Sequence, residues 1–311
     1  MFLGSHESRV ADTVIEAIQS TSDEAPGLLA YVEHHLGTHH SPDLFHVQHE
    51  LVKAVCGPLA TKQRAAAKTA TETQERLEHV QGQLQGAGDT PAKRGPGRPP
   101  KATASLEQLA QEAQAASQEF ERISTQREQV TQSIRRLGQA YHFVNLERGV
   151  RRNGPLIAAD IRAQIDSIRS VAQHEGLSQA CLERIAKAER VVPKMQATIE
   201  FVSGYVRQQV HQLELTPPVS YALHAHLIPA FYLERVAQTR TVSGGEPLRA
   251  LAERLRTPLF EPGGALAELS EVQQGQLNQH AKELAEVFQR SSSHVEGRNG
   301  YLSLRNHQLR G

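Results

Sequence analysis

The sequence has no tryptophan, and its tyrosine and phenylalanine residues together make up only 5% of the 311 residues. Cores of β-sandwich proteins are rich in aromatic and β-branched side chains, so this shortage disfavours that fold class. Between residues 138 and 290, no segment alternates polar and apolar residues over the length of a typical strand. The composition therefore favours helices packed through leucine, alanine, isoleucine and valine, and predicts a mainly α protein.

Net charge, paired cysteines and long apolar segments are also absent. The formal net charge is zero, so any contact with nucleic acid has to come from local basic patches. Cys56 and Cys181 belong to no cysteine motif, and we interpret them as free thiols in a reducing cytoplasm. No apolar run approaches 18 residues, and the first ten residues have no apolar signal region. We therefore expect neither a membrane span nor a signal peptide.

The strongest periodic pattern lies between residues 106 and 137, where seam residues recur at alternating steps of three and four over more than four heptads. A weaker seam precedes it, and the two flank a shared break. This arrangement predicts an antiparallel coiled-coil hairpin over residues 59–137, and the alternative is an ordinary long bundle helix. The strong seam comprises Leu106, Leu109, Ala113, Ala116, Phe120, Ile123, Arg127, Val130, Ile134 and Leu137, and the weak seam Leu59, Gln63, Ala66, Ala70, Thr73, Leu77, Val80 and Leu84.

The break at residues 86–104 is basic and rich in proline and glycine, and it contains the sequence "RGPGRPPK". This sequence resembles an AT-hook, in which proline keeps the backbone extended, glycine allows close approach and arginine enters the narrow minor groove of A/T-rich DNA. A solvated basic linker at the tip of the hairpin is an equally good interpretation. The candidate DNA-binding residues here are Arg94, Arg98 and Lys101.

Residues 138–290 are expected to form an all-helical domain. A first helix starts at Pro155 and ends at Gly176, with isoleucines and a valine along one face. A second helix is expected to stop at Pro193, and a third to stop before Pro217. A second basic patch, Arg148, Arg151 and Arg152, is interpreted either as a phosphate clamp or as a solvated turn.

Acidic residues at element boundaries are the candidates for metal chemistry. In residues 1–58 the segment "VIEAIQSTSD" predicts a short strand that ends at Asp23, and a helix follows from Pro26. Glu296 lies in "SSSHVEGRNG", which is interpreted either as a loop or as the start of a helix bearing a metal-binding acid. Carboxylates that converge from such positions can hold two Mg²⁺ ions, which activate the nucleophile in phosphodiester transfer.

Three motifs follow one another in an informative order: Asp23 in "STSDEAPG", the Asp43-x-x-His46 motif, and Glu296 in "EGRN". Their order resembles that of DDE transposases of the ribonuclease-H-like superfamily, in particular a bacterial transposase-like branch with a large helical insertion. The resemblance implies a partial ribonuclease-H-like α/β core at residues 1–58 and 291–311, interrupted by the helices of residues 59–290. It also implies that Asp23 and Glu296 are catalytic and bind Mg²⁺ or Mn²⁺, that Asp43 and His46 support the site, and that Arg298 and Asn299 contact phosphate.

The function implied by this resemblance is DNA transposition, in which the full-length protein binds element ends and transfers strands in the bacterial cytoplasm, at the nucleoid. Self-association through the heptad seam is a separate expectation, drawn from the residues. Only 22 residues precede Asp23, which leaves no room for the strands that carry the first catalytic acid in that family. We therefore expect an N-terminally truncated fragment that does not catalyse strand transfer alone. The alternatives are a non-enzymatic DNA-binding or scaffold protein acting through the basic-tipped hairpin, and a helical interaction protein without a DNA role.

Overall fold

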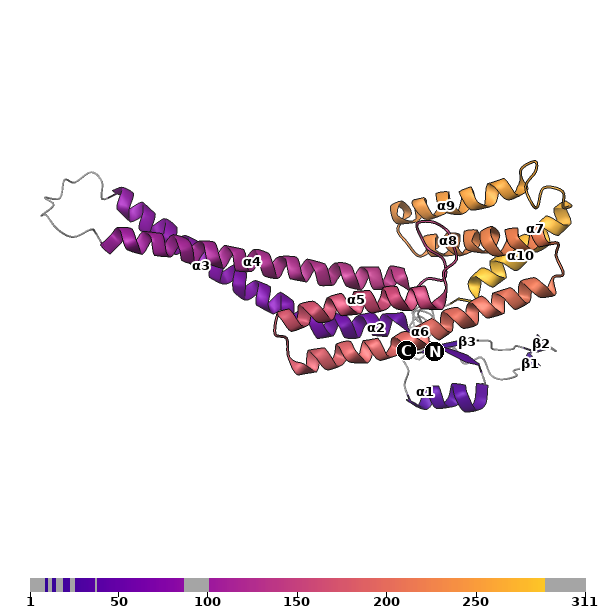
Figure 1. The fold of residues 1–311 in the computed structure, drawn as a ribbon, viewed down its shortest axis with the longest axis horizontal. Coiled ribbons are helices and arrows are strands. Elements are labelled where there is room, and N and C mark those ends of the chain that lie inside the picture. Colours follow the sequence, from indigo (N-terminus) through magenta and orange to yellow (C-terminus); the bar gives the residue numbers. More distant parts are fainter. Residues whose placement is uncertain are drawn as a thin grey trace, which may run out of the picture. The chain divides into compact units, whose positions relative to one another are not determined.

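The computed structural model describes residues 9–10, 13–14, 19–22, 26–36, 38–86 and 101–288. Within these ranges the protein is mainly α, as its composition predicts (Figure 1). Among the described helices, none combines the length and the apolar character needed to cross a membrane.

The described strands are β1 (Arg9–Val10), β2 (Thr13–Val14), β3 (Gln19–Ser22) and β4 (His39–Pro42). The described helices, with η marking π-helical segments, are α1 (Pro26–Tyr31), η1 (Val32–Leu36), α2 (Leu44–Leu51), η2 (Val52–Cys56), α3 (Gly57–Gly86), α4 (Lys101–Ala140), α5 (Gly154–His174), α6 (Gln179–Gln212), α7 (Pro217–Ala222), η4 (Leu223–Leu227), α8 (Ile228–Gln238), α9 (Val242–Phe260) and α10 (Glu271–Glu286).

The chain forms two compact units. The hairpin unit comprises residues 51–134 and 167–185, and the main unit comprises residues 1–50, 135–166 and 186–311. The hairpin unit therefore combines most of the segment predicted as a hairpin with a short stretch of the segment predicted as a helical domain. The helices α4, α5 and α6 each contribute residues to both units, and α2 contributes its last residue, Leu51, to the hairpin unit.

In the hairpin unit, α3 and α4 lie antiparallel and side by side, as the two seams predict (Figure 1). The apolar seam residues Leu59, Ile123 and Val130 are buried, whereas most other positions of the two helices are exposed. The polar seam residues face each other: Arg127 Nη1 donates to Gln63 Oε1, and Gln63 Nε2 donates to Ser124 Oγ at 2.8 Å. A polar pair within a seam fixes the register of two helices. The break between the two helices was predicted to extend to residue 104, but α4 already begins at Lys101, so the break is shorter than predicted.

A buried carboxylate joins three segments of the hairpin unit. The side chain of Glu175, just after α5, is fully buried. Arg122 of α4 donates to both of its oxygens, Nη2 to Oε2 at 3.3 Å and Nη1 to Oε1, and Lys62 Nζ of α3 lies 3.5 Å from Oε2. The hydrogen bond from Arg122, followed by the positive charges of Arg122 and Lys62, lowers the pKa of Glu175 despite its burial. The carboxylate therefore stays ionised at neutral pH and links α3, α4 and the end of α5.

In the main unit, β3 and β4 pair in parallel, with Gln19 opposite His39 and Ser22 opposite Pro42. Parallel strands need a crossover connection, and α1 with η1 supplies it. The strand that the sequence predicts before Asp23 is present as β3, and the helix expected from Pro26 is present as α1 and η1. The first two strands, β1 and β2, pair with each other and are antiparallel.

Several of the chain's few aromatic residues meet in the core of the main unit. Phe143 and Tyr232 have ring centroids 4.3 Å apart, and Tyr141 packs edge-on against Phe288 at 5.4 Å. His142 Nδ1 lies 2.6 Å from the hydroxyl of Tyr232, so the two buried polar groups satisfy each other. These contacts attach the segment after α4 to α8 and to Phe288, which follows α10.

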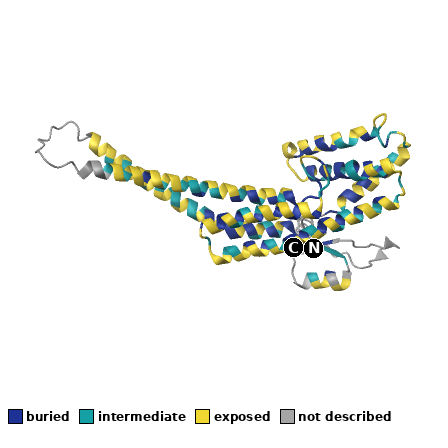
Figure 2. Cartoon of the chain, in the orientation of Figure 1, coloured by how far each residue is buried: buried dark blue, intermediate teal, exposed yellow. Residues whose placement is uncertain are grey.

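The isoleucine face predicted for the helix after Pro155 is confirmed in α5. Ile157, Ile161, Ile165 and Ile168 are each 0% exposed. Buried positions recur along one side of α5, with exposed positions between them (Figure 2). This 3.6-residue period is the one that the sequence shows.

The prediction that a helix stops at Pro193 is wrong, because α6 runs unbroken from Gln179 to Gln212 and contains this proline. Val192 and Met195, on either side of Pro193, are fully buried, and Pro193 itself is exposed. Burial of the apolar stripe across the proline therefore outweighs the cost of a proline in the helix interior, which is about 3 kcal/mol.

Replacing Pro193 with alanine is expected to raise the free energy of unfolding by about 1–3 kcal/mol. The alanine restores a backbone N–H at an exposed position and removes no buried side chain. Urea unfolding followed by circular dichroism measures the change. A loss of stability in Pro193→Ala would contradict the view that packing, and not the proline, holds α6 together here.

Candidate nucleic-acid interface

Most of the residues that the sequence singles out for metal and DNA binding lie outside the described part of the chain. Lys101 is the first residue of α4, but its side chain is not among those described. Asp43, His46, Arg151 and Arg152 are described and can be placed. Outside the described ranges lie Asp23, Arg94, Arg98, Glu296, Arg298 and Asn299.

Asp43 caps the helix that follows β4. Its side chain is 1% exposed, its Oδ1 accepts the N–H of Phe45 at 2.8 Å, and its main-chain oxygen accepts the N–H of Val47 at 3.3 Å. This is the geometry of a helix N-cap, which satisfies amide groups that have no partner within the helix. His46 lies one turn further on, with Nε2 4.0 Å from Asp43 Oδ2. Asp43 and His46 are therefore neighbours, as the motif requires, and Asp43 also holds the corner between β4 and α2.

Among the described residues, no group of three or more histidine, cysteine, aspartate or glutamate side chains is arranged to share a metal ion. The carboxylates predicted to bind Mg²⁺ or Mn²⁺ are those of Asp23 and Glu296, which lie outside these residues. The metal site therefore stays a prediction from the resemblance.

A tight turn after α4 determines where the second basic patch points. The side chain of Asn145 accepts the N–H groups of Glu147 and Arg148, both at 2.9 Å, and Gly149 adopts a φ of +70°. The turn closes with a β-bridge between Val144 and Arg151. Successive side chains of extended backbone point to opposite sides, so Arg151 and the next residue, Arg152, reach different neighbours.

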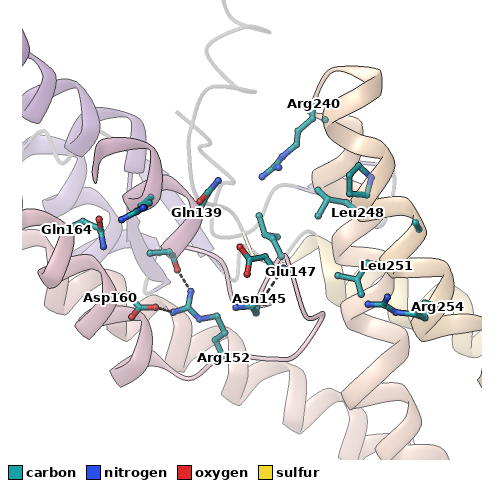
Figure 3. A pocket seen from close by; sticks show the side chains of 16 residues that line it. Gln139, Asn145, Glu147, Arg152, Asp160, Gln164, Arg240, Leu248, Leu251 and Arg254 are labelled. Carbon is teal, nitrogen blue, oxygen red and sulfur yellow. Dashed lines mark hydrogen bonds and ion pairs between the residues drawn. The ribbon is translucent and has the colours of Figure 1, made fainter. Parts of the chain in front are cut away.

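Arg152 lines a cavity of about 690 Å³ in the main unit (Figure 3). Its guanidinium donates to the main-chain oxygen of Ala140 at 2.9 Å and to Asp160 of α5. Figure 3 shows Arg240 and Arg254 on the opposite wall and Glu147 between the walls. Four arginines and two carboxylates line this cavity: Arg136, Arg152, Arg240, Arg254, Glu147 and Asp160.

A second cavity, of about 450 Å³, adjoins the first, because Gln139 and Arg240 line both. It adds a fifth arginine, Arg135, and the half-exposed ring of Phe45. We call the two cavities together the arginine groove. Within the described part of the chain, Arg152 is the groove arginine that pairs with a carboxylate. The exposed Arg136, Arg240 and Arg254 form no ion pair there, so the groove carries a local positive charge in a chain of zero net charge.

Of the groove arginines, Arg152 was predicted from the sequence and the others were not. Arg136 lies in the last turns of α4, whereas Arg240 and Arg254 belong to the segment around α9, more than 100 residues later. No local motif contains all three, since only the tertiary fold brings them to one cavity. The adjacent pair Arg135 and Arg136 was the one local signal.

The side chain of Arg151 points the other way and contacts His224 of η4. Its Nη1 lies against both nitrogens of the imidazole, Nε2 and, at 2.6 Å, Nδ1. Burial, then the charges of Arg151 and Arg207, lower the pKa of His224 to about 4. The unfolded chain takes up this proton at the ordinary histidine pKa, about 6.5, whereas the folded protein does not. This histidine therefore reduces stability as the pH falls from about 6.5 to about 4.

Replacing Arg151 with methionine is expected to raise the pKa of His224 above its value of about 4. The substitution removes a neighbouring cation and keeps most of the burial, which is the larger cause. A pH titration of the His224 ring signals by NMR measures the change, with Arg190→Gln on an exposed part of α6 as the control. An unchanged pKa in Arg151→Met would show that the two groups are not coupled.

Comparison with known proteins relates only the C-terminal part of the chain to a family. Residues 223–311 match the model of a family of unknown function (DUF6399). Searches of curated proteins and of solved structures gave no match. The matched segment begins at η4 and includes α8, α9 and α10, and thus contains Arg240 and Arg254 of the arginine groove. The chain is therefore similar, over its C-terminal part, to a family whose function has not been determined.

Proposed function

We propose that this protein binds DNA, and that the arginine groove holds the phosphate backbone. The observation that carries the proposal is the excess of arginines over carboxylates in the groove, since the chain as a whole is neutral. Arginine contacts to phosphates supply affinity without reading sequence. The groove is therefore a surface for the backbone of DNA, and base recognition belongs to other residues.

We further propose that the DNA-binding protein is of the DDE transposase type, with a ribonuclease-H-like core. The parallel pair of β3 and β4, joined by α1 and η1, supports this proposal, as does the position of Asp43 directly after β4. In such a core, Asp23 and Glu296 would bind Mg²⁺ or Mn²⁺, and Arg298 and Asn299 would contact phosphate. The bound ions would activate the attacking oxygen and stabilise the leaving oxygen of the phosphodiester.

The non-enzymatic alternative shares the DNA-binding step and differs in the chemistry. In that alternative the hairpin of α3 and α4 is a scaffold, and the segment between the two helices contacts DNA. Because this chain is not expected to catalyse strand transfer alone, Mn²⁺ binding measured by calorimetry separates the two proposals. Binding that is lost in Asp23→Asn and in Glu296→Gln supports the transposase type, whereas DNA binding without any Mn²⁺ binding favours the scaffold.

The groove itself is tested by fluorescence anisotropy with a short labelled DNA duplex at low salt. The triple variant Arg136→Gln, Arg240→Gln, Arg254→Gln is expected to bind at least roughly tenfold more weakly than the unmodified protein. The matched control changes three exposed arginines outside the groove, Arg76, Arg184 and Arg190, to glutamine and removes the same charge. Equal affinities of the two triple variants would contradict the proposal.

A further inference from the structure

A second group of cations lies in the main unit, and none of its members lines the arginine groove. It consists of Arg151 after the β-bridge, Arg207 on α6 and His224 on η4. Arg151 Nη1 lies 2.6 Å from His224 Nδ1, and Arg207 is close enough to influence the charge state of both. Three separate elements therefore bring positive or potentially positive side chains together.

This cluster has no negative partner among the described residues. Arg151 contacts a neutral imidazole, and its Nε is buried without any hydrogen-bond partner. Buried guanidinium groups are normally paired with carboxylates, because an unpaired buried charge is costly. A buried donor left unsatisfied needs an explanation, and a missing ligand is one.

The charge states support this interpretation. Burial, followed by repulsion from Arg207, lowers the pKa of Arg151 to about 10. The pKa of His224 is lowered to about 4 by burial and by the two arginines. Every neighbouring charge that influences these two groups is positive, so an anion bound beside them would stabilise both.

We propose that Arg151, Arg207 and His224 form a binding site for a phosphate-class oxyanion. The Nε and Nη2 edge of Arg151 matches two oxygens of such an anion, and the second guanidinium, that of Arg207, adds further donors. The ring of His224 contacts Nη1 of Arg151 through both nitrogens and so holds this edge in place. Arg207 is exposed, so its flexible side chain can move to admit the ligand. A free phosphate ion and a phosphodiester present the same oxygens, and both fit this chemistry.

Two titrations at pH 7 test the site, one with inorganic phosphate followed by calorimetry and one with a single-stranded oligothymidylate followed by anisotropy. Arg151→Gln and Arg207→Gln are each expected to weaken binding by roughly tenfold, the contribution of a charge-assisted hydrogen bond. Arg190→Gln, on the same helix as Arg207 and outside the cluster, is expected to change affinity by less than about twofold. Phosphate is also expected to shift the ring signals of His224 in the NMR spectrum of the unmodified protein.

The pattern of losses identifies the source of the anion. Weaker binding of inorganic phosphate alone assigns the site to a free ion, and weaker binding of the oligonucleotide as well assigns it to nucleic acid. The inference is overturned if neither Arg151→Gln nor Arg207→Gln changes the affinity for either probe, or if Arg190→Gln weakens binding equally.

Because Arg207 is exposed, its substitution tests the site even if Arg151→Gln fails to fold. The site does not depend on the arginine groove, whose triple variant should still bind inorganic phosphate normally.

Discussion

Replacing Arg122 with methionine is expected to lower the free energy of unfolding by roughly 3 kcal/mol, because it leaves the buried carboxylate of Glu175 without its main partner. The side chain of Glu175 is 0% exposed, and Arg122 donates to both of its oxygens. Lys62 remains nearby, but its Nζ lies 3.5 Å from one carboxylate oxygen and donates to the main-chain oxygen of Glu175 instead. Chemical denaturation measures the loss, and Lys68→Met is the control, since its pair with Glu72 is exposed and contributes less than about 0.5 kcal/mol.

The same substitution is expected to change how stability depends on pH. The folded pKa of Glu175 is lowered, so its contribution is present above the ordinary glutamate pKa of 4.5 and is lost as the pH falls below it. In Arg122→Met the main cause of the lowered pKa is gone, and burial favours protonation instead. The variant should therefore lose less stability than the unmodified protein on acidification through this range. If Arg122→Met costs no more than Lys68→Met at neutral pH, Glu175 does not link the helices of the hairpin unit.

Replacing Gly149 with alanine is the second large effect that we expect, about 2 kcal/mol of lost stability, since the half-buried Leu255 side chain can partly move away from the new methyl group. The φ of +70° disfavours any residue with a Cβ, and that Cβ would lie 2.5 Å from Leu255 Cδ1. Gly263→Ala is the matched control, because Gly263 also has a positive φ, +88°, but has open space around it. It should show the backbone cost alone, about 1 kcal/mol.

The contribution of the clash can be separated with a second substitution. In a Leu255→Ala background the contact at 2.5 Å is removed, so Gly149→Ala should cost about as little as Gly263→Ala. Thermal unfolding of the four proteins of this cycle measures the coupling. Equal losses for Gly149→Ala and Gly263→Ala in the unmodified background would show that the turn carrying Arg151 and Arg152 is not held against α9.

Periodic features of the fold could be predicted from the sequence because they are local. The heptad positions of Leu59, Ile123 and Val130 and the isoleucine spacing of α5 both report which side of a helix is buried. Pro193 was misread for the opposite reason. A proline is a local signal for a helix end, whereas the burial of Val192 and Met195 that keeps α6 continuous depends on the tertiary fold.

The candidate site was less predictable than the fold. Asp43 and His46 are one helical turn apart, so their proximity follows from the motif, but the capping role of Asp43 requires knowing where α2 begins. The arginine groove draws Arg136, Arg152 and Arg240 from distant parts of the sequence. Because the net charge of the chain is zero, the sequence predicts only that a basic surface has to be local. The folded chain shows where this surface lies.

The dependence of DNA affinity on salt concentration tests the central claim most directly. Each phosphate contact makes the slope of log affinity against log salt concentration more negative by about 0.9. Arg136→Gln, Arg240→Gln, Arg254→Gln should therefore make the slope shallower by about 2.7, whereas the control at Arg76, Arg184 and Arg190 should leave it unchanged. An arginine groove that holds the DNA backbone predicts this difference. The same slope for the unmodified protein and the groove variant would contradict it.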